Sequence, residues 1–317
     1  MSTKKTKSIV TGGAGFIGST LADKLIELGH EVIVIDNLYS GMRSYVNEAA
    51  KFYEVDICDE AKIKEIFDKE SEDGGIDYVF HLAAQIDVRL SVKDPIFDNK
   101  VNVLGSLNIL DNAYSHCVKK IMFSSTGGAL YGGAEEIPTL ETYPTYPFSP
   151  YGIHKLTFEK YLSYYYKVYG QKYTSLRFSN VYGPRQYKGG EAGVVAIFID
   201  NAVNGKPSFI NGDGLQTRDF VYVDDVVSAF VTAAKSDYVG EINFSTGIEN
   251  NLLDIMIAIE KALGREVAKE FRAAMPGEER RSCLDYSKAN KILNWQPMIY
   301  LEEGIRRTIE WTKSVKK

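Results

Sequence analysis

Apolar positions in the first half of the chain follow two different spacings. Short runs rich in Val, Ile and Phe have the length of buried strands. After most of them, apolar residues recur three and four positions apart, as on one face of a helix. Strands are predicted over residues 7–11, 31–35, 51–57, 76–82, 120–124 and 173–178. Helices are predicted over residues 16–28, 59–71, 97–116 and 150–169. Strands that alternate with helices predict an α/β fold with a doubly wound parallel sheet.

The pattern changes after residue 178. A loop rich in Gly, Pro and Arg is predicted at 180–190, a helix at 194–204, and a strand from Phe209 into the turn at 212–214. Asp224-Asp225 is expected to start a helix by N-capping. Residues 241–245 resemble one more strand of the first sheet. We therefore expect a first domain over residues 1–178 and a smaller C-terminal α/β lobe over 179–317. The two should be partly interleaved, because about 219–246 would return to the sheet.

A glycine-rich turn joins the first predicted strand to the first helix. It reads Thr11-Gly-Gly-Ala-Gly-Phe-Ile-Gly18, and the second strand ends at Asp36. In a Rossmann unit such glycines permit the tight turn, the approach of a pyrophosphate and close packing of the helix. The pyrophosphate would meet free N–H groups at the helix N-terminus. Asp36 could accept hydrogen bonds from both ribose hydroxyls and would repel a 2′-phosphate, which favours NAD over NADP. A flexible turn alone would not explain the flanking strands and the acid.

Composition narrows the class of protein. The chain has 317 residues, of which 44% are apolar, and a net charge of −5, which argues against nucleic-acid binding. No apolar run approaches the roughly 18 residues of a membrane span. A signal peptide at the basic start would be cleaved through the glycine turn, so none is expected. The three cysteines lie far apart, and no metal-ligand spacing links them to the four histidines. We expect a cytoplasmic protein without a metal, a membrane or a nucleic-acid partner.

A candidate catalytic pair lies on the helix predicted at 150–169. Tyr151 and Lys155 are four residues apart and share a face, and Ser149-Pro150 supplies a helix start. A lysine ammonium and a positive nicotinamide ring would both favour the tyrosine phenolate and lower its pKa. Such a pair can arise by chance among 21 tyrosines. It gains weight from the hydroxyl residues at 124–126, which follow the fifth predicted strand.

Taken together, these motifs resemble those of the extended short-chain dehydrogenase/reductases. The similarity also includes Leu82-Ala83-Ala84, the segments 177–185 and 212–225, and Pro276-Gly277-Glu278 before Asp285. Within that superfamily the chain is most similar to the UDP-hexose 4-epimerases. The resemblance implies a resident NAD, and a sugar that is oxidised at C4, rotates as a 4-keto intermediate and is reduced on its other face.

The resemblance also implies roles for individual residues. Tyr151 would remove the proton of the 4-hydroxyl, Thr126 would hydrogen-bond that oxygen with help from Ser125, and Lys155 would tune Tyr151 and hold the nicotinamide ribose. Asp56 would meet the adenine amino group, unless it caps a helix. The implied cofactor-binding residues are Gly12, Gly15, Phe16, Ile17, Asp36, Asn37, Asp56, Ile57, Leu82, Ala84, Asn102, Ser124, Tyr151 and Lys155. The implied substrate-binding residues are Thr126, Tyr151, Asn180, Val195, Phe209, Arg218, Arg280 and Ser282, with the two arginines on the phosphates.

Several positions depart from the pattern of the 4-epimerases. The active-site hydroxyl is Thr126, as in sugar-nucleotide dehydratases, but Gly127-Gly128 replaces the acidic pair that dehydratases carry there, which argues against elimination. His154 stands where serine is usual, and we expect it to be a solvated helix histidine. Met275 stands where many relatives carry an arginine, which shifts phosphate binding towards Arg280. Ser282 is small, which leaves room for a 2-acetamido group.

The sequence leaves three alternatives for the function open, and it also bears on the oligomeric state. UDP-GlcNAc/UDP-GalNAc is possible beside UDP-Glc/UDP-Gal as the sugar pair. A UDP-glucuronate 4-epimerase or decarboxylase would share the same front half of the chain. A non-catalytic NAD-binding regulator would typically lack the Tyr/Lys pair. Aromatic residues on more than one side of the helix at 150–169 indicate a second buried face, as at a subunit interface. The resemblance implies a homodimer formed through this helix and the one near 97–116.

Overall fold

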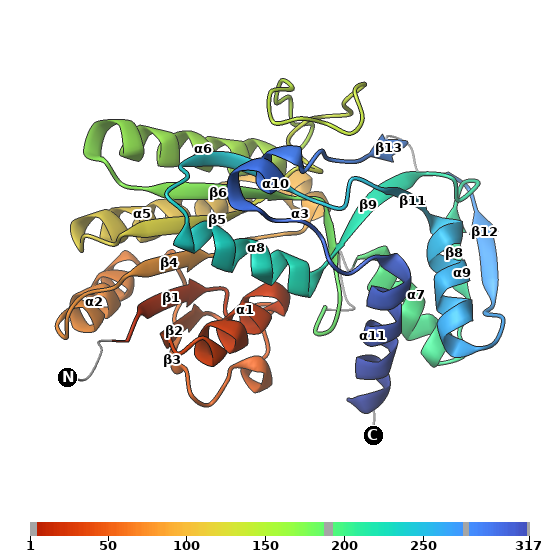
Figure 1. The fold of residues 1–317 in the computed structure, drawn as a ribbon, viewed down its shortest axis with the longest axis horizontal. Coiled ribbons are helices and arrows are strands. Elements are labelled where there is room, and N and C mark those ends of the chain that lie inside the picture. Colours follow the sequence, from red (N-terminus) through yellow and green to blue (C-terminus); the bar gives the residue numbers. More distant parts are fainter. Residues whose placement is uncertain (1–4, 187–192, 275–278, 316–317) are drawn as a thin grey trace.

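A parallel sheet forms the centre of the larger part of the molecule (Figure 1). The computed structural model describes residues 5–186, 193–274 and 279–315. Seven strands lie in the order β10-β6-β5-β4-β1-β2-β3, and every neighbouring pair is parallel. They are β1 (Lys7–Thr11), β2 (Glu31–Asp36), β3 (Lys51–Glu54), β4 (Tyr78–His81), β5 (Lys120–Thr126), β6 (Tyr173–Phe178) and β10 (Gly240–Phe244). The strand order reverses between β1 and β4, which is where doubly wound sheets bind ligands.

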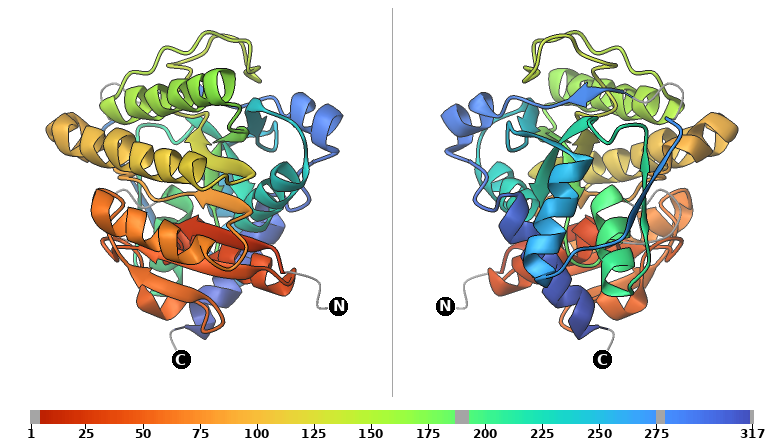
Figure 2. Two further views of the ribbon diagram at one scale, coloured as in Figure 1. Left: turned by 90° about the vertical axis from the view of Figure 1, so that its left-hand side faces the viewer. Right: turned by 90° about the vertical axis from the view of Figure 1, so that its right-hand side faces the viewer.

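Helices cover both faces of this sheet (Figures 1 and 2). One face carries α2 (Glu60–Ser71), α5 (Ser106–Ser115) and α6 (Pro150–Tyr169), and the other carries α1 (Phe16–Glu27), α8 (Val223–Lys235) and α10 (Ser287–Leu293). Successive strand residues supply the two cores: Ile9 and Ile33 face the first set of helices, and Val10 and Val34 face the second. Because both faces are buried, neighbouring residues of one strand can all be apolar, as over residues 32–35 of β2.

A second lobe is built mainly from later residues. It contains a four-stranded sheet of β7 (Asn180–Tyr182), β9 (Thr217–Tyr222), β11 (Glu249–Asn251) and β13 (Arg281–Ser282), and a pair of β8 (Ser208–Asn211) with β12 (Lys269–Arg272). Around them lie α7 (Val194–Val203), α9 (Leu252–Leu263) and α11 (Leu301–Ser314), which share a core with Phe198, Phe220 and Ile255 (Figure 2, right).

The predicted fold class is confirmed, and four local predictions need correction. The loop expected at 180–190 begins instead with the strand β7. The single helix expected at 97–116 is α4 (Pro95–Asn99), a π-helical segment η2 (Lys100–Gly105) and α5, and the short α3 (Val88–Lys93) before them was not predicted. The strand expected over 51–57 ends at Glu54. Asp224-Asp225 does not cap α8, which begins at Val223; the Asp225 carboxylate accepts instead from the backbone N–H groups of Met298 and Ile299.

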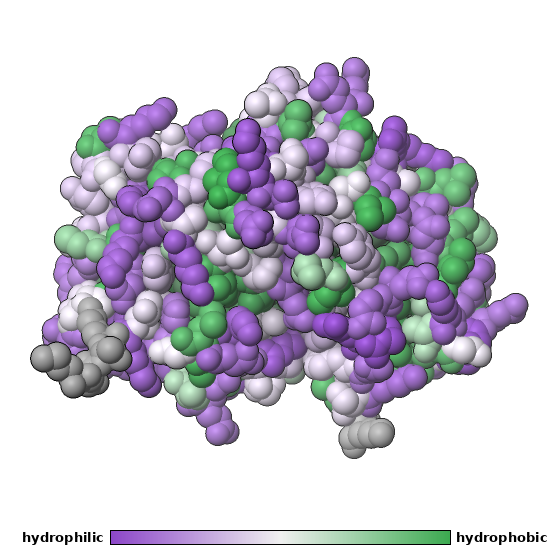
Figure 3. All heavy atoms as spheres, viewed as in Figure 1, coloured by the Kyte–Doolittle hydropathy of each residue, from purple (hydrophilic) through white to green (hydrophobic). Residues whose placement is uncertain are grey.

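Polar and apolar side chains are mixed over the surface drawn in Figure 3. Among the residues that the structure describes, no helix is both long and apolar enough to span a bilayer.

Candidate active site

The glycine turn is shaped by two close approaches of backbone to backbone. Gly12 has a φ of +70°, and a Cβ at this position would lie 2.7 Å from the backbone nitrogen of Ala83. A Cβ on Gly18 would lie 2.1 Å from the carbonyl oxygen of Gly12. Only glycine fits either position, so the turn can bring α1 close to β1 and β4. The N-cap of α1 is Gly15, which offers no side-chain acceptor, so the first N–H groups of the helix stay available to an anion.

These N–H groups face a cavity of about 380 Å³ at the carboxyl ends of the strands. Nearly all residues predicted to bind the cofactor or to act in catalysis line it: Gly12, Gly15, Phe16, Ile17, Asp36, Asn37, Asp56, Ile57, Leu82, Ala84, Ser124, Thr126, Tyr151 and Lys155. Asn102 is the exception, because its buried side chain is engaged with the backbone of Gln85. The residues present thus fit a dinucleotide, with the helix N-terminus for its phosphates and the Tyr/Lys pair further along.

Two acids line the cavity at the ends of β2 and β3: Asp36 is the last residue of β2, and Asp56 lies two residues after β3. Asp36 is buried and accepts from the backbone N–H groups of Ala14 at 3.0 Å and Leu38 at 2.8 Å. Burial raises its pKa, and the two backbone hydrogen bonds oppose that rise. Burial also acts to raise the pKa of Asp56, but hydrogen bonds from Cys58 and Asn37 outweigh it and the pKa falls. The helix-cap alternative for Asp56 does not hold, since α2 is capped by Asp59.

Tyr151 and Lys155 both face the cavity from the first turns of α6. Ser149 caps this helix by accepting from Gly152, and Pro150 lies in its first turn, as predicted. Lys155 is 3% exposed, and its Nζ donates to the carbonyl oxygen of Ser124 at 3.0 Å. That Nζ lies 5.8 Å from the ring centroid of Tyr151. Burial lowers the pKa of Lys155 to about 8. Burial also raises the pKa of Tyr151, and the negative charge of Asp98 adds to that rise.

The hydroxyl residues at the end of β5 have separate partners. Thr126 lines the cavity, and its Oγ1 accepts from the backbone N–H of Ala129 at 3.3 Å. Ser125 also reaches the cavity wall, but its Oγ donates to Glu159 at 2.7 Å. Since Ser125 is engaged in this way, the structure favours Thr126 as the free donor to a substrate oxygen.

Apart from Thr126 and Tyr151, the residues predicted to bind the substrate do not line this cavity. Val195 is buried in the core of the second lobe, and Phe209 lies 3.2 Å from the guanidinium carbon of Arg272, measured to the ring centroid. Arg280 pairs with Asp213 through two contacts of 2.8 and 2.9 Å.

The other predicted substrate residues lie nearer to Gly127 and Gly128, which directly follow the hydroxyl residues at the end of β5. Asn180 begins β7, and a Cβ on Gly128 would lie 3.9 Å from its Oδ1. Ser282 is paired with Arg218 between β13 and β9, and it borders a small hollow beside Gly127 and Gly128. Met275 lies outside the described residues.

Comparison with known proteins now decides the family. The model of the NAD dependent epimerase/dehydratase family matches residues 8–244. The chain belongs to this family.

Its solved relatives resemble it over nearly the whole chain. A UDP-glucose 4-epimerase of Thermotoga maritima, solved with UDP-glucose, is 44% identical with a TM-score of 0.95, and the match covers 98% of this chain and 100% of that one. A UDP-glucose 4-epimerase of Thermus thermophilus, solved with NAD, is 40% identical with a TM-score of 0.91 over 97% and 99% of the two chains. A UDP-N-acetylglucosamine 4-epimerase of Methanobrevibacter ruminantium, solved with UDP-N-acetylmuramic acid, is 34% identical with a TM-score of 0.92 over 99% and 100%. The resemblance inferred from sequence is thereby confirmed.

Two features near the site were not predicted from the sequence. Glu159 and Arg177 form a buried ion pair beside Ser125 at the end of β5. Arg177 Nη2 lies 2.6 Å from Glu159 Oε2. A signal was present, because Arg177 is a charged residue between Leu176 and Phe178 in a predicted buried strand, and Glu159 continues the α6 face of Tyr151 and Lys155.

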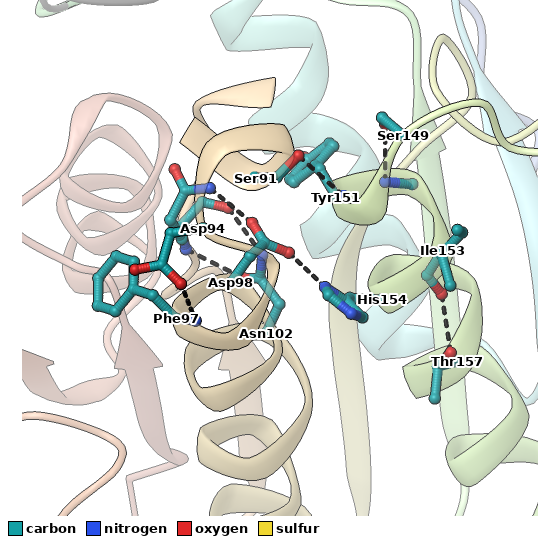
Figure 4. Close-up of polar contacts among 12 residues, drawn as sticks. Ser91, Asp94, Phe97, Asp98, Asn102, Ser149, Tyr151, Ile153, His154 and Thr157 are labelled. Atoms are coloured by element: carbon teal, nitrogen blue, oxygen red, sulfur yellow. Dashed lines mark hydrogen bonds and ion pairs between the residues drawn. The ribbon is translucent and has the colours of Figure 1, made fainter. Parts of the chain in front are cut away.

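The second feature is His154, which was expected to be a solvated helix residue. That expectation is wrong: the His154 side chain is 12% exposed, and its Nδ1 lies 2.5 Å from the carboxylate of Asp98 (Figure 4).

Proposed function

We propose that this protein is an NAD-dependent UDP-hexose 4-epimerase, which inverts C4 through a transient 4-keto sugar. The observation that carries this proposal is one cavity lined by the glycine turn, by Asp36 and by the Tyr151, Lys155 and Thr126 side chains. The Thermotoga relative bound to UDP-glucose and the Thermus relative bound to NAD support the choice of substrate and cofactor.

The chain would hold the cofactor at three places. The N-terminus of α1 would bind the pyrophosphate, Asp36 the adenosine ribose, and Lys155 the nicotinamide ribose. NAD, when bound, supplies the acceptor for the C4 hydride and then its donor, so the overall reaction needs no other oxidant.

Proton movement falls to residues of α6 and β5. Tyr151 would take the proton of the sugar's 4-hydroxyl and later return it. Its pKa is raised by burial in the chain alone, so the phenolate needs positive charge close by. Lys155 supplies one such charge, and Thr126 would hold the sugar oxygen by a hydrogen bond. The 4-keto sugar must then present its other face, which requires firm binding of the nucleotide and loose binding of the hexose.

Binding of the nucleotide would fall to residues of the second lobe. We assign the phosphates to Arg218 and Arg280 with Asn180, and the nucleoside to the region of Val195 and Phe209. The Arg280 guanidinium would have to exchange its Asp213 partner for a phosphate oxygen, which offers comparable bidentate geometry.

The small side chain at Ser282 favours UDP-GlcNAc/UDP-GalNAc as a second sugar pair. Ser282 borders a hollow beside Gly127 and Gly128, directly after Thr126, and the Methanobrevibacter relative is a UDP-N-acetylglucosamine 4-epimerase. Replacing Ser282 by Tyr should fill this hollow and reduce turnover of the acetamido sugars relative to UDP-Glc and UDP-Gal. An unchanged ratio of kcat/KM for the two pairs would refute the assignment of Ser282.

The function is tested by incubating the purified protein with UDP-Glc, UDP-Gal, UDP-GlcNAc, UDP-GalNAc or UDP-GlcA, each without added NAD. Products are followed by NMR. We expect C4 inversion of at least one UDP-hexose by the wild type and none by Tyr151→Phe. Inversion of UDP-GlcA alone, or a decarboxylated product, would identify a UDP-glucuronate 4-epimerase or decarboxylase instead. No reaction with any of the sugars would favour a non-catalytic NAD-binding regulator.

We also propose a division into domains and a cellular location. We assign a Rossmann domain to 1–178 and a substrate lobe to 179–317, and we place the protein in the cytoplasm, where its three free cysteines would remain reduced.

We further propose a homodimer, because α6 and the helical segment before and along α5 lie side by side and expose apolar residues such as Leu104, Tyr164 and Val168 (Figure 2, left). Light scattering should give twice the chain mass for the wild type and a smaller mass for Tyr164→Glu. A wild type of single-chain mass would refute the dimer.

A further inference from the structure

The carboxylate of Asp98 on α4 is buried between α4 and α6, next to the start of α6, the helix that carries Tyr151 and Lys155. The Asp98 side chain is 0% exposed, and both of its oxygens are engaged. Oδ2 accepts from His154 Nδ1 on α6 at 2.5 Å, and Oδ1 accepts from Gln85 Nε2 at 2.5 Å. Figure 4 shows the Asp98 and His154 side chains pointing towards each other from the two helices. A buried carboxylate needs such donors, because it has lost its hydration.

The same contacts continue to the wall of the cofactor cavity. Gln85 lines that cavity, and its backbone is bound at both ends by Asn102: its N–H donates to Asn102 Oδ1 at 3.0 Å, and its carbonyl accepts from Asn102 Nδ2 at 2.9 Å. Asn102, which was predicted to bind the cofactor, therefore does not line the cavity itself but holds the backbone of Gln85, which does. Tyr151 has a second tie to this region, because its backbone N–H donates to Ser91 Oγ on α3 at 3.1 Å.

Asp98 also acts electrostatically on Tyr151 and, together with Glu159, on Lys155. Its negative charge adds to the burial effect that raises the pKa of Tyr151, so it opposes the phenolate. Among the charged groups of the described elements packed here, Arg89 and Lys93 of α3 and Lys100 of η2 are exposed. Asp94, the N-cap of α4, is also exposed, and Asp87, the N-cap of α3, is half-buried. On α6 itself, Lys155 donates to the Ser124 carbonyl and Glu159 is paired with Arg177. His154 is thus the donor placed directly on Asp98 from the helix that carries Tyr151.

We propose that His154 is a positioning residue, which fixes α6 to the cavity wall at Gln85 through Asp98 and moderates the effect of the Asp98 charge on Tyr151. The kinetic consequences rest on the proposed 4-epimerase function. The structural consequence, a rigid segment from Ala83 to Asp87, does not depend on it.

Four variants test the proposal in the full-length protein. His154→Leu removes the donor to Asp98, and His154→Asn keeps an N–H at the same branch of the side chain. Asp98→Asn removes the charge but keeps the shape. Thr157→Ala is the matched control, because it removes a hydroxyl from the next turn of α6 whose bond runs only to the Ile153 carbonyl (Figure 4).

The first measurement is hydrogen exchange of the peptide covering residues 83–87, which needs no activity. We expect exchange to be about tenfold faster in His154→Leu, close to the wild type in His154→Asn, and unchanged in Thr157→Ala. If His154→Leu does not fold, Asp98→Asn replaces it in this comparison, because it also weakens the contact with Gln85. Unchanged exchange in both variants would overturn the positioning role.

The second measurement is the pH profile of kcat on whichever UDP-hexose the wild type inverts. Activity needs the Tyr151 phenolate, so its acidic limb follows the pKa of Tyr151. Asp98→Asn should move that limb to lower pH by about one unit, and His154→Leu should move it to higher pH. A general loss of structure would lower kcat without shifting the two limbs in opposite directions. Shifts of the same sign, or none, would overturn the electrostatic part. If the wild type inverts no sugar, the proposed function fails, and hydrogen exchange alone decides the positioning role.

Discussion

Replacing Arg177 by Met should cost this protein a large part of its stability, because it leaves a buried carboxylate without its cation. Arg177 is 4% exposed and Glu159 is 0% exposed. Their side chains meet through two contacts, Nη2 to Oε2 at 2.6 Å and Nε to Oε1 at 3.0 Å. The remaining partners of the carboxylate are hydroxyls of Ser125 at 2.7 Å and Ser175 at 2.8 Å.

The size of the effect follows from these contacts. Removing one member of a buried ion pair costs about 3–5 kcal/mol. The two serine hydroxyls still solvate the Glu159 carboxylate, so we expect the lower end, about 3 kcal/mol. With an unfolding entropy of about 2.1 cal/mol/K for each of 317 residues, this loss should lower the unfolding temperature by about 4–5 °C. Urea denaturation and calorimetry measure both quantities.

Two further variants separate the buried charge from a general effect of the substitution. Arg306→Met makes the same replacement in an exposed arginine of α11 that contacts Glu303 and Glu310, and it should leave the midpoint unchanged. The double variant Arg177→Met, Glu159→Leu removes both charges and should regain much of the lost stability. The reasoning is refuted if Arg177→Met is as stable as Arg306→Met, or if the double variant is no more stable than the single one.

Three other outcomes are expected. Tyr151→Phe should lower kcat for C4 inversion by about 10²–10⁴-fold, because the proton of the 4-hydroxyl loses its acceptor, while NAD binding measured by calorimetry stays intact. Gly18→Ala should lose NAD affinity, because its Cβ would lie 2.1 Å from the Gly12 carbonyl oxygen and displace the turn; wild-type affinity in this variant would contradict that geometry. Burial lowers the pKa of Lys155 to about 8 from its usual 10.5, so the unfolded chain holds this proton over a range where the folded chain has released it. Wild-type stability should therefore rise between pH 8 and 10.5 relative to Lys155→Met, by up to about 3 kcal/mol, and urea midpoints that move in parallel would contradict this.

The parts of the site that sequence could predict are those set by local chain geometry. At Gly12 and Gly18 the turn meets steric limits that only glycine satisfies, and Asp36 is the last residue of β2. The spacing of Tyr151 and Lys155 places both on one face of α6. Each of these features lies within one helix or one strand–turn–helix unit, so periodicity was sufficient to find it.

The parts that sequence could not predict depend on partners far apart in the chain. His154 was expected in solvent because its helix position carries no sign of Asp98, which lies 56 residues earlier. Asp225 was expected to cap its own helix, but its carboxylate accepts from Met298 and Ile299 more than seventy residues away. Hydrogen bonds of this kind are set by tertiary packing rather than by local propensity.

The last strand of the large sheet also determines when the sheet can be completed during synthesis. β6 ends at Phe178, but its outer neighbour β10 is made only at Gly240–Phe244. Until those residues leave the ribosome, the edge of β6 exposes unpaired N–H and carbonyl groups beside the apolar side chains of Leu176 and Phe178. A nascent chain that ends between Phe178 and Gly240 therefore carries a strand edge that can pair with another chain. The edge of β6 is covered only after the residues between β6 and β10 have been translated.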